Sequence, residues 1–197
     1  MQTRTGIKRR ARRGFTLIEL VVVVAIVGVL ISIIAPNLIG SKDGASAQLM
    51  LKTSQSVAQN WSLINQACGT SSAVSGSVLP AATKTVSDVI FTGSANVAAA
   101  YATCYAQSKV MALAEVSQPG ASAGTYNVAG YAVSLSGGGS SALQVQYAAV
   151  PDALVLLMAQ KYNPGLAALE ASDATSPVLQ YGTATAGART VTVLRPI

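Results

Sequence analysis

The pattern of apolar and polar residues changes along the chain. Residues 15–35 are apolar almost throughout, and from Leu20 onward only Gly28 and Ser32 interrupt this run of 21 residues. As an α-helix rising about 1.5 Å per residue, the run would measure roughly 30 Å, enough to cross a bilayer's hydrocarbon core. Its many β-branched residues favour a strand in water, but a single strand in lipid would leave its backbone unpaired. The pattern therefore predicts a membrane-spanning helix.

Residues 36–68 show a different pattern, with apolar positions on only one side of a predicted helix. The residues on this face lie four and three positions apart: Met50, Ser54, Val57, Trp61, Ile64 and Cys68. Between the two patterns, Pro36, Gly40 and Gly44 favour a kink or local melting. We expect one long interrupted helix over residues 15–68, with its second half packed against a folded domain.

Residues 69–197 carry mixed signals typical of an α+β domain. Two alternating segments flank a glycine-rich connection and predict a hairpin. The expected elements, in chain order, are a loop over 70–93 with a short strand at 86–90, a helix over 95–116, strands at 131–135 and 143–147, a helix over 151–161, and strands at 178–181 and 190–194. The predicted fold is a long N-terminal helix packed on an antiparallel sheet.

Composition excludes several classes of chemistry. The 197 residues contain no histidine, so catalytic triads with histidine and histidine-ligated metals are ruled out. The two cysteines cannot complete a four-thiolate metal site within one chain. We find no nucleophile–base pair and no phosphate-binding loop, so we expect no catalytic residue, no cofactor and no metal.

Charge is concentrated at the N-terminus. Of 13 basic residues, six lie within residues 1–14, where there is no acidic residue: Arg4, Lys8, Arg9, Arg10, Arg12 and Arg13. The remaining seven basic residues balance all seven acidic ones, so the body has no general attraction for nucleic acid, although a local patch stays open. The basic cluster favours a cytoplasmic N-terminus, with everything after Ala35 on the other side of the membrane.

Three kinds of segment fit a basic leader before an apolar run. A cleaved secretory signal peptide would use a small-residue site such as Ala45–Ala47, but this lies more than ten residues beyond the apolar core. The second kind is a permanent signal anchor, and the third is a more specialised signal. Glu19 favours the third, because a carboxylate in a spanning helix needs a partner. Cleavage between Gly14 and Phe15 would create an α-amino cation four residues from that acid, available to a neighbouring copy.

The sequence Gly14-Phe15-Thr16-Leu17-Ile18-Glu19, followed by the apolar run, resembles the class III signal of type IV pilins and pseudopilins. In that family a prepilin peptidase cuts after the glycine and methylates the new N-terminus. The resemblance implies that residues 1–14 are the leader, Phe15 the methylated first residue, Glu19 the assembly acid and Pro36 the helix kink. The 14-residue leader is longer than the shortest pilin leaders, whereas a first phenylalanine is typical of those.

The resemblance implies a structural function. The chain would be a prepilin that waits in the inner membrane with its C-terminal domain outside the cytoplasm, and then packs with copies of itself into a type IV pilus or related filament at the cell surface. A prepilin peptidase, a platform protein and an assembly ATPase would be its partners. The alternatives are a pseudopilin of a type II secretion system, a minor pilin, and a signal-anchored exported protein.

Other residues offer further hypotheses. Cys68 and Cys104 would lie in an oxidising compartment, where we expect a disulfide; two separate buried thiols are the alternative. Asp152, Glu170 and Asp173 could supply oxygen atoms to Ca²⁺, as in some pseudopilins, but solvated loop acids are commoner. A glycosylation sequon at residues 60–62 lies in a predicted helix, and we expect its Trp61 in the core.

Overall fold

The computed structural model describes residues 17–197 except residue 123, and it describes no side chains for residues 32–41. The chain divides into two units, residues 1–41 and 42–197, which are treated separately below. The helices are α1 (Leu17–Cys68), α2 (Val86–Thr92), α3 (Ala102–Ser108) and α4 (Asp152–Gln160), with 3₁₀ turns at Ser94–Asn96 and Ala99–Tyr101. The strands are β1 (Ser117–Pro119), β2 (Tyr126–Val128), β3 (Tyr131–Gly137), β4 (Leu143–Pro151), β5 (Leu179–Tyr181) and β6 (Ala188–Arg195).

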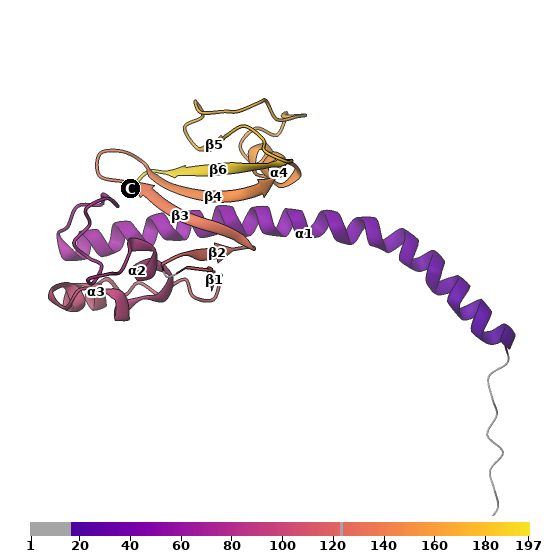
Figure 1. The fold of residues 1–197 in the computed structure, drawn as a ribbon, viewed down its shortest axis with the longest axis horizontal. Helices are drawn as coiled ribbons and strands as arrows, with labels where there is room; N and C mark the ends of the chain where they lie inside the picture. The colour runs from indigo at the N-terminus through magenta and orange to yellow at the C-terminus, as the bar shows by residue number, and fades with distance from the viewer. Residues whose placement is uncertain (1–16, 123) are drawn as a thin grey trace, which may run out of the picture. The chain divides into compact units, whose positions relative to one another are not determined.

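Helix α1 is continuous in secondary structure from Leu17 to Cys68 (Figure 1). The predicted local melting around Pro36, Gly40 and Gly44 is therefore wrong, because every residue between the two patterns is helical. A proline removes one helical hydrogen bond but does not always end a helix. The predicted kink lies at Pro36, whose side chain is outside those described, and it stays a prediction.

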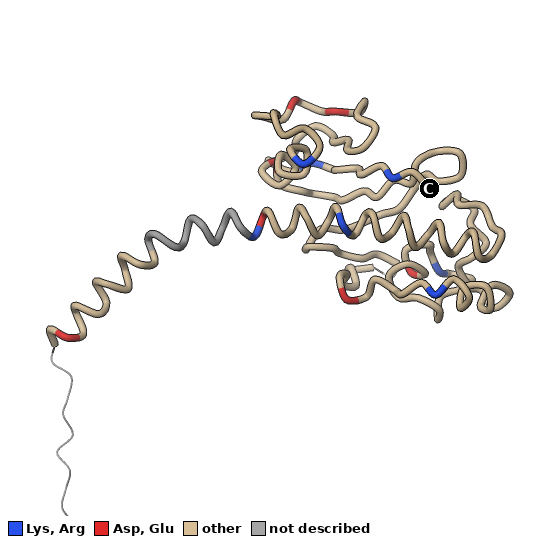
Figure 2. Tube along the Cα trace, turned by 180° about the vertical axis from the view of Figure 1, so that it is seen from behind, with Lys and Arg blue, Asp and Glu red and all other residues tan. Residues whose placement is uncertain are grey.

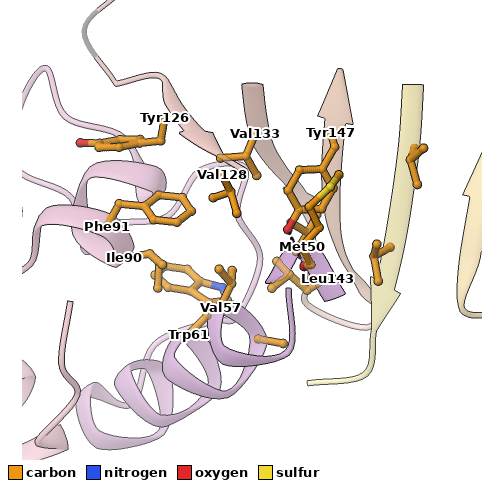
Figure 3. Close-up of a cluster of buried hydrophobic side chains, with 14 of the residues drawn as sticks. Met50, Val57, Trp61, Ile90, Phe91, Tyr126, Val128, Val133, Leu143 and Tyr147 are labelled. Atoms are coloured by element: carbon orange, nitrogen blue, oxygen red, sulfur yellow. Dashed lines mark hydrogen bonds between the residues drawn. The ribbon is translucent and has the colours of Figure 1, made fainter. Parts of the chain in front are cut away.

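The second half of α1 packs into the core of the domain through the predicted face. Met50, Val57, Trp61 and Ile64 are completely buried, and Ser54 is buried with them. Figure 3 shows Val57 and Trp61 beside side chains of α2 and of the sheet, which forms the other wall of the core. The four-and-three spacing therefore identified the buried face of the helix correctly.

The sheet has six antiparallel strands in the order β1-β2-β3-β4-β6-β5. Its inner face follows the alternation of the strands, and one cross-strand row shows this: Val133 pairs with Tyr147, which pairs with Val191, which pairs with Tyr181. All of these except β1 and β2 were predicted. The α+β fold, a long helix packed on an antiparallel sheet, is confirmed (Figure 1).

The hairpin between β3 and β4 is also as predicted, and its glycines have a steric role. Gly138 has a positive φ of 80°, and a Cβ there would collide with the carbonyl oxygen of Ser72. The amide of Val74 donates to the carbonyl of Gly137 at 2.9 Å. The glycine connection therefore docks closely on the loop that follows α1.

Two of the predicted elements are wrong. Residues 86–90 form part of helix α2 rather than a strand, because Thr85 and Asp88 make a capping box that starts a helix. Residues 95–116 are not one helix but two 3₁₀ turns and the short α3, which ends at Lys109 in the left-handed conformation. Strands β1 and β2, three residues each, had no counterpart among the expected elements.

Candidate assembly site

The first half of α1 presents an apolar surface. All described side chains from Leu17 to Ile31 are exposed, and the large ones are between 46% and 81% exposed. Within the described residues, no helix is long and apolar enough to span a membrane. The predicted span, residues 15–35, extends beyond the described side chains at both ends, and it stays a prediction.

An apolar surface of this extent is expected to be shielded from water by another apolar surface. Soluble proteins rarely expose contiguous apolar patches of more than a few hundred square ångströms. The exposed row runs around the helix rather than along one face, since consecutive residues from Leu20 to Val24 are all exposed. A helix that is apolar all round is suited to burial on every side, by lipid or by other helices.

Glu19 lies in the first turn of α1 with an exposed side chain. A carboxylate there complements the partial positive charge of the helix N-terminus. Gly14 and Phe15, the predicted cleavage and methylation residues, lie outside the described residues. The structure therefore describes the acid of the predicted charge pair but not the amine.

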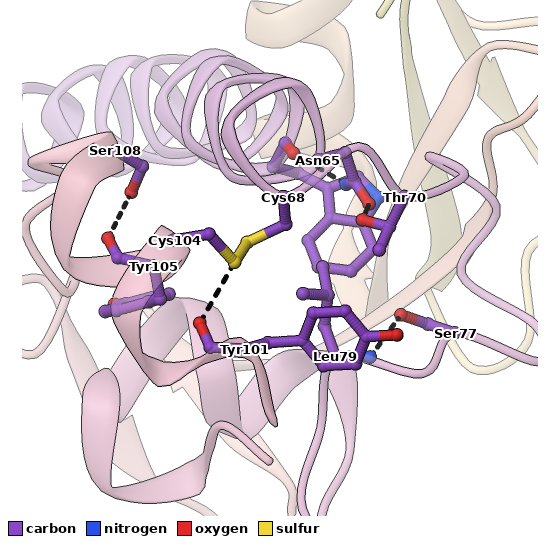
Figure 4. The surroundings of a disulfide bond; sticks show 10 residues. Asn65, Cys68, Thr70, Ser77, Leu79, Tyr101, Cys104, Tyr105 and Ser108 are labelled. Carbon is purple, nitrogen blue, oxygen red and sulfur yellow. Dashed lines mark hydrogen bonds between the residues drawn. A yellow bond between two sulfur atoms is a disulfide. The ribbon is translucent and has the colours of Figure 1, made fainter. Parts of the chain in front are cut away.

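The other end of α1 is tied to the domain by the predicted disulfide. Cys68, the last residue of the helix, is bonded to Cys104 in α3, with 5.1 Å between their Cα atoms (Figure 4). The bond closes a loop with a sequence separation of 36 residues. Nearby, Asn65 donates to the carbonyl of Trp61 and accepts from Thr70. The helix end is therefore fixed both covalently and by hydrogen bonds.

A buried polar cluster holds α2 against the sheet. The Tyr126 hydroxyl donates to Oδ1 of Asp88 at 2.7 Å, and the Thr85 amide donates to Oδ2 at 2.8 Å. Burial raises the pKa of Asp88, but the hydrogen bonds from Tyr126 and Thr85 outweigh it, so the net pKa lies below its ordinary value. The same burial raises the pKa of the Tyr126 hydroxyl. The cluster stabilises the domain.

Two of the three acids considered for Ca²⁺, Asp152 and Asp173, have hydrogen-bond partners on their carboxylates. Asp152 accepts from Nε of Arg189 at 2.7 Å, and the Nη1 group of Arg189 donates to the carbonyls of Glu170, Ala171 and Gly182. The Asp173 carboxylate accepts from the backbone of the residues after it, and these bonds lower its pKa. No group of three potential metal ligands occurs among the described residues. The Arg189 guanidinium therefore lies among the oxygen atoms of residues 152, 170, 171 and 182.

The sequon residue Asn60 lies in α1, as predicted for this segment, and its amide donates to the Met111 carbonyl at 3.0 Å. Trp61 is a core residue, and its indole N–H donates to the Ser72 carbonyl at 2.7 Å. These contacts support a structural role in the domain for both Asn60 and Trp61.

Comparison with known proteins finds a similarity in the N-terminal region. Residues 9–35 match the family model described as the prokaryotic N-terminal methylation motif. This match supports the resemblance of the N-terminal region to type IV pilins and pseudopilins. The matched range includes Gly14, Phe15 and Glu19, which are the predicted leader end, the predicted methylated residue and the predicted assembly acid.

The relatives that were matched carry a more specific name. The chain is 51% identical to the type II secretion system core protein G of Klebsiella michiganensis over 41 residues, or 21% of this chain and 29% of that protein. It is 54% identical to the core protein G of Escherichia coli over 37 residues, and 51% identical to that of Vibrio cholerae over 41 residues. The chain thus matches less than a third of each relative's length, and no solved structure matches it.

Proposed function

We propose that this chain is a pseudopilin, a structural subunit that is made as a prepilin and polymerises through the first half of α1. One observation carries the proposal: the helix segment that is exposed and apolar on every side lies within the residues that match an N-terminal methylation motif. Before assembly, the inner membrane would cover this surface, with the domain outside the cytoplasm. After assembly, the same segments of neighbouring copies would cover it, and helix packing would replace lipid contacts.

The names of the relatives favour a filament of a type II secretion system over a type IV pilus. All the proteins cited above are secretion core proteins, although they match only the N-terminal region. The cysteine pair is the feature that mildly favours a pilus. We therefore propose that the filament belongs to a type II secretion system. A type IV pilus, which would serve adhesion or motility, is the less favoured alternative.

Processing would create the assembly site. A prepilin peptidase would cut between Gly14 and Phe15 and methylate the new amine, and a platform protein and an ATPase would drive assembly. The amine of one copy would then pair with Glu19 of its neighbour. Two unit charges about 4 Å apart at an effective dielectric of about 20 attract by roughly 4 kcal/mol before desolvation is counted. This attraction is sufficient to set the register between subunits.

Analysis of the mature N-terminus tests the proposal. The parental chain should begin at N-methylated Phe15, whereas Gly14→Leu should accumulate as an uncut precursor that keeps its basic leader. Gly28→Ala is the matched control, because a Cβ at Gly28 has no neighbour within 4 Å and should leave processing unchanged. A parental chain starting beyond Ala45, or normal maturation of Gly14→Leu, would contradict the proposal.

Deletion of the gene for this chain distinguishes a secretion filament from a type IV pilus. If it is a secretion pseudopilin, the deletion strain should retain its secreted enzymes in the periplasm and keep its surface fibres. Loss of fibres with normal secretion would instead assign the chain to a pilus.

A further inference from the structure

A buried arginine lies among oxygen atoms from three separate parts of the domain. The side chain of Arg189 in β6 is 8% exposed, and its Nε donates to Oδ1 of Asp152, the first residue of α4, at 2.7 Å. Its Nη1 group donates to the carbonyls of Glu170, Ala171 and Gly182 at 2.8, 2.6 and 3.3 Å. One carboxylate and several carbonyls are the kinds of ligand that a hard cation such as Ca²⁺ takes in proteins. We call these four oxygen atoms the oxygen cage.

The guanidinium of Arg189 suits the oxygen cage in charge and in geometry. An arginine side chain stays ionised and directs five N–H donors in one plane, so it can bind several oxygen atoms at once. The guanidinium also lies over the ring of Tyr181, with 5.4 Å between its central carbon and the ring centroid. The Asp152 carboxylate balances the charge, since a buried charge is stable only when it is paired. The protein itself therefore supplies a cation to the cage.

The oxygen cage fixes the loop between α4 and β5, residues 161–178. In the middle of this loop, residues 167–172, the described atoms make two hydrogen bonds, and Arg189 donates both. Two leucine side chains of the loop are partly buried against the core, and the backbone of Asp173 pairs with β5. The loop carries two acidic residues, which Figure 2 shows in red at the outer edge of the domain. Arg189 is therefore the polar anchor of the middle of the loop.

The acids of this region do not fit a Ca²⁺ site while the guanidinium is present. The Asp152 carboxylate accepts from Arg189, and the Asp173 carboxylate accepts from the backbone amides two and three residues further on. The side chain of Glu170 is exposed, and this residue contributes its carbonyl to the cage instead. A divalent ion beside a buried guanidinium would also meet a like charge.

We propose that Arg189 acts as a built-in cation that orders the loop between α4 and β5, so that this loop does not depend on a metal ion. With Arg189 in place, removal or addition of divalent cations should leave the loop unchanged. Without it, the Asp152 carboxylate and the three carbonyls are left without a cation, and they should accept Ca²⁺ from solution. This property belongs to the folded domain and does not depend on assembly of the chain into a filament.

Cleavage at Glu170 measures the order of the loop in the full chain in detergent. A glutamate-specific serine protease has three sites in the chain, Glu19, Glu115 and Glu170, and the last one lies in the loop. Cleavage of the parent at Glu170 should stay within about twofold on addition of EDTA or of Ca²⁺. Arg189→Ala should be cut there about tenfold faster, which corresponds to a loss of about 1.4 kcal/mol in the stability of the loop. Mass spectrometry identifies each cut, and cleavage at Glu115 is the internal control.

Added Ca²⁺ distinguishes a cation site from ordinary packing. Ca²⁺ at about 10 mM, roughly ten times the dissociation constant of a weak extracellular site, should slow the cleavage of Arg189→Ala about tenfold. Asp152→Asn in the same chain should abolish this effect, because it removes the carboxylate of the cage. Lys161→Gln is the matched control, since it removes an exposed cation at the start of the same loop and should behave like the parent.

A second pair of variants covers the case in which Arg189→Ala does not fold. Arg189→Lys keeps the positive charge and should be cut at Glu170 more slowly than Arg189→Gln, which is neutral. Equal cleavage of these two variants would show that charge is not what holds the loop, and would overturn the proposal.

Three further results would also overturn it. The first is faster cleavage of the parent at Glu170 in EDTA, which would show that the loop needs a metal ion. The second is cleavage of Arg189→Ala at the parental rate, which would show that the leucine side chains hold the loop without a cation. The third is fast cleavage of Arg189→Ala that Ca²⁺ does not slow, which would show that Arg189 acts through packing alone. Leader processing and filament assembly are not involved in any of these measurements, so the proposed function is tested separately.

Discussion

The two halves of α1 differ in their chemistry and have opposite environments. From Leu17 to Ile31 the described side chains are exposed, whereas in the second half Met50, Val57 and Trp61 are completely buried. The halves differ in apolar content and in its distribution: the first half is apolar almost all round, and the second on one face. The pattern of apolar residues in each half therefore matches the exposure of its side chains in the structure.

This comparison implies that the two halves contribute to different free energies. Substitutions in the second half should change the free energy of unfolding of the domain. Substitutions in the first half should change assembly and leave unfolding almost unaffected. Each of the following predictions tests that separation for the full chain in detergent, from the largest expected effect to the smallest.

The largest effect should follow Trp61→Ala. The side chain is completely buried and its N–H donates to the Ser72 carbonyl, so its loss should destabilise the domain by about 3–5 kcal/mol. Val23→Ala, at a position 56% exposed, should change the unfolding free energy by less than about 0.5 kcal/mol. Urea unfolding followed by circular dichroism measures both. Equal changes in unfolding free energy for Trp61→Ala and Val23→Ala would contradict the separation of the two halves of α1.

Glu19→Val should change assembly and leave the unfolding free energy of the domain unaffected, the reverse of Trp61→Ala. The variant should be cleaved and should unfold like the parent, yet enter filaments poorly, because the attraction of roughly 4 kcal/mol with a neighbour's amine is lost. Valine enters lipid more easily than glutamate, so failed insertion cannot explain the defect. Glu115→Val, at an exposed acid of the domain, is the control. Comparison of sheared-filament and membrane fractions measures the effect, and parental incorporation by the variant alone would contradict it.

Removal of the disulfide tests how firmly the domain holds the end of α1. Cys68→Ser/Cys104→Ser should destabilise the domain by roughly 3–4 kcal/mol in the chain-entropy model, since the bond closes a loop of 36 residues. Processing at the distant N-terminus should be normal. Urea unfolding with and without reductant should show the same loss in the parent, and an unchanged midpoint would show that the bond restrains little.

Asp88→Asn should reveal a pH-dependent part of the domain's stability. Because the folded pKa of Asp88 is lowered, its contribution is complete above the unfolded value of about 3.9 and is lost as pH falls through the folded value. We expect the variant to be less stable by about 1–3 kcal/mol at neutral pH, and the difference to shrink as pH falls below the unfolded value of about 3.9. Unfolding curves at several pH values measure this. A difference that does not depend on pH would contradict the assignment.

The same residue shows where sequence interpretation succeeded and failed. The 36–68 face, the 131–147 hairpin and α4 were predictable, because each is a long or sharply bounded local pattern. The helix at Val86–Thr92 was missed, since Val86, Val89 and Ile90 favour a strand and the deciding signal is the Thr85–Asp88 capping box. That signal is present in the sequence and would have corrected the prediction.

Other features depend on contacts that no local pattern contains. Strands β1 and β2 are too short to alternate visibly, and their residues pair because Tyr126 and Val128 are buried. The amine expected to pair with Glu19 belongs to another copy. The role of Arg189 requires residues 152, 170, 171 and 182 to meet, which the fold alone achieves.

The smallest predicted effect concerns Thr53, on the buried half of α1. Its hydroxyl oxygen is buried and has no hydrogen-bond partner among the described residues, and its side chain is 2% exposed. A buried hydroxyl without a partner has lost its bonds to water and gained none in return. Thr53→Val keeps the branched shape and removes the hydroxyl, so it should stabilise the domain by about 1 kcal/mol.

Two matched variants make this small effect interpretable. Thr53→Ser keeps the hydroxyl and loses a methyl group, so it should destabilise the domain by roughly 1 kcal/mol. Val22→Thr makes the reverse change in the first half of α1, where the side chain is 50% exposed, and should leave unfolding unchanged. If Thr53→Val is instead less stable than the parent, the hydroxyl bonds to the carbonyl one helical turn earlier, and its burial costs nothing. If Val22→Thr destabilises the domain, the first half of α1 contributes to the folding of the domain, and the two halves are not independent.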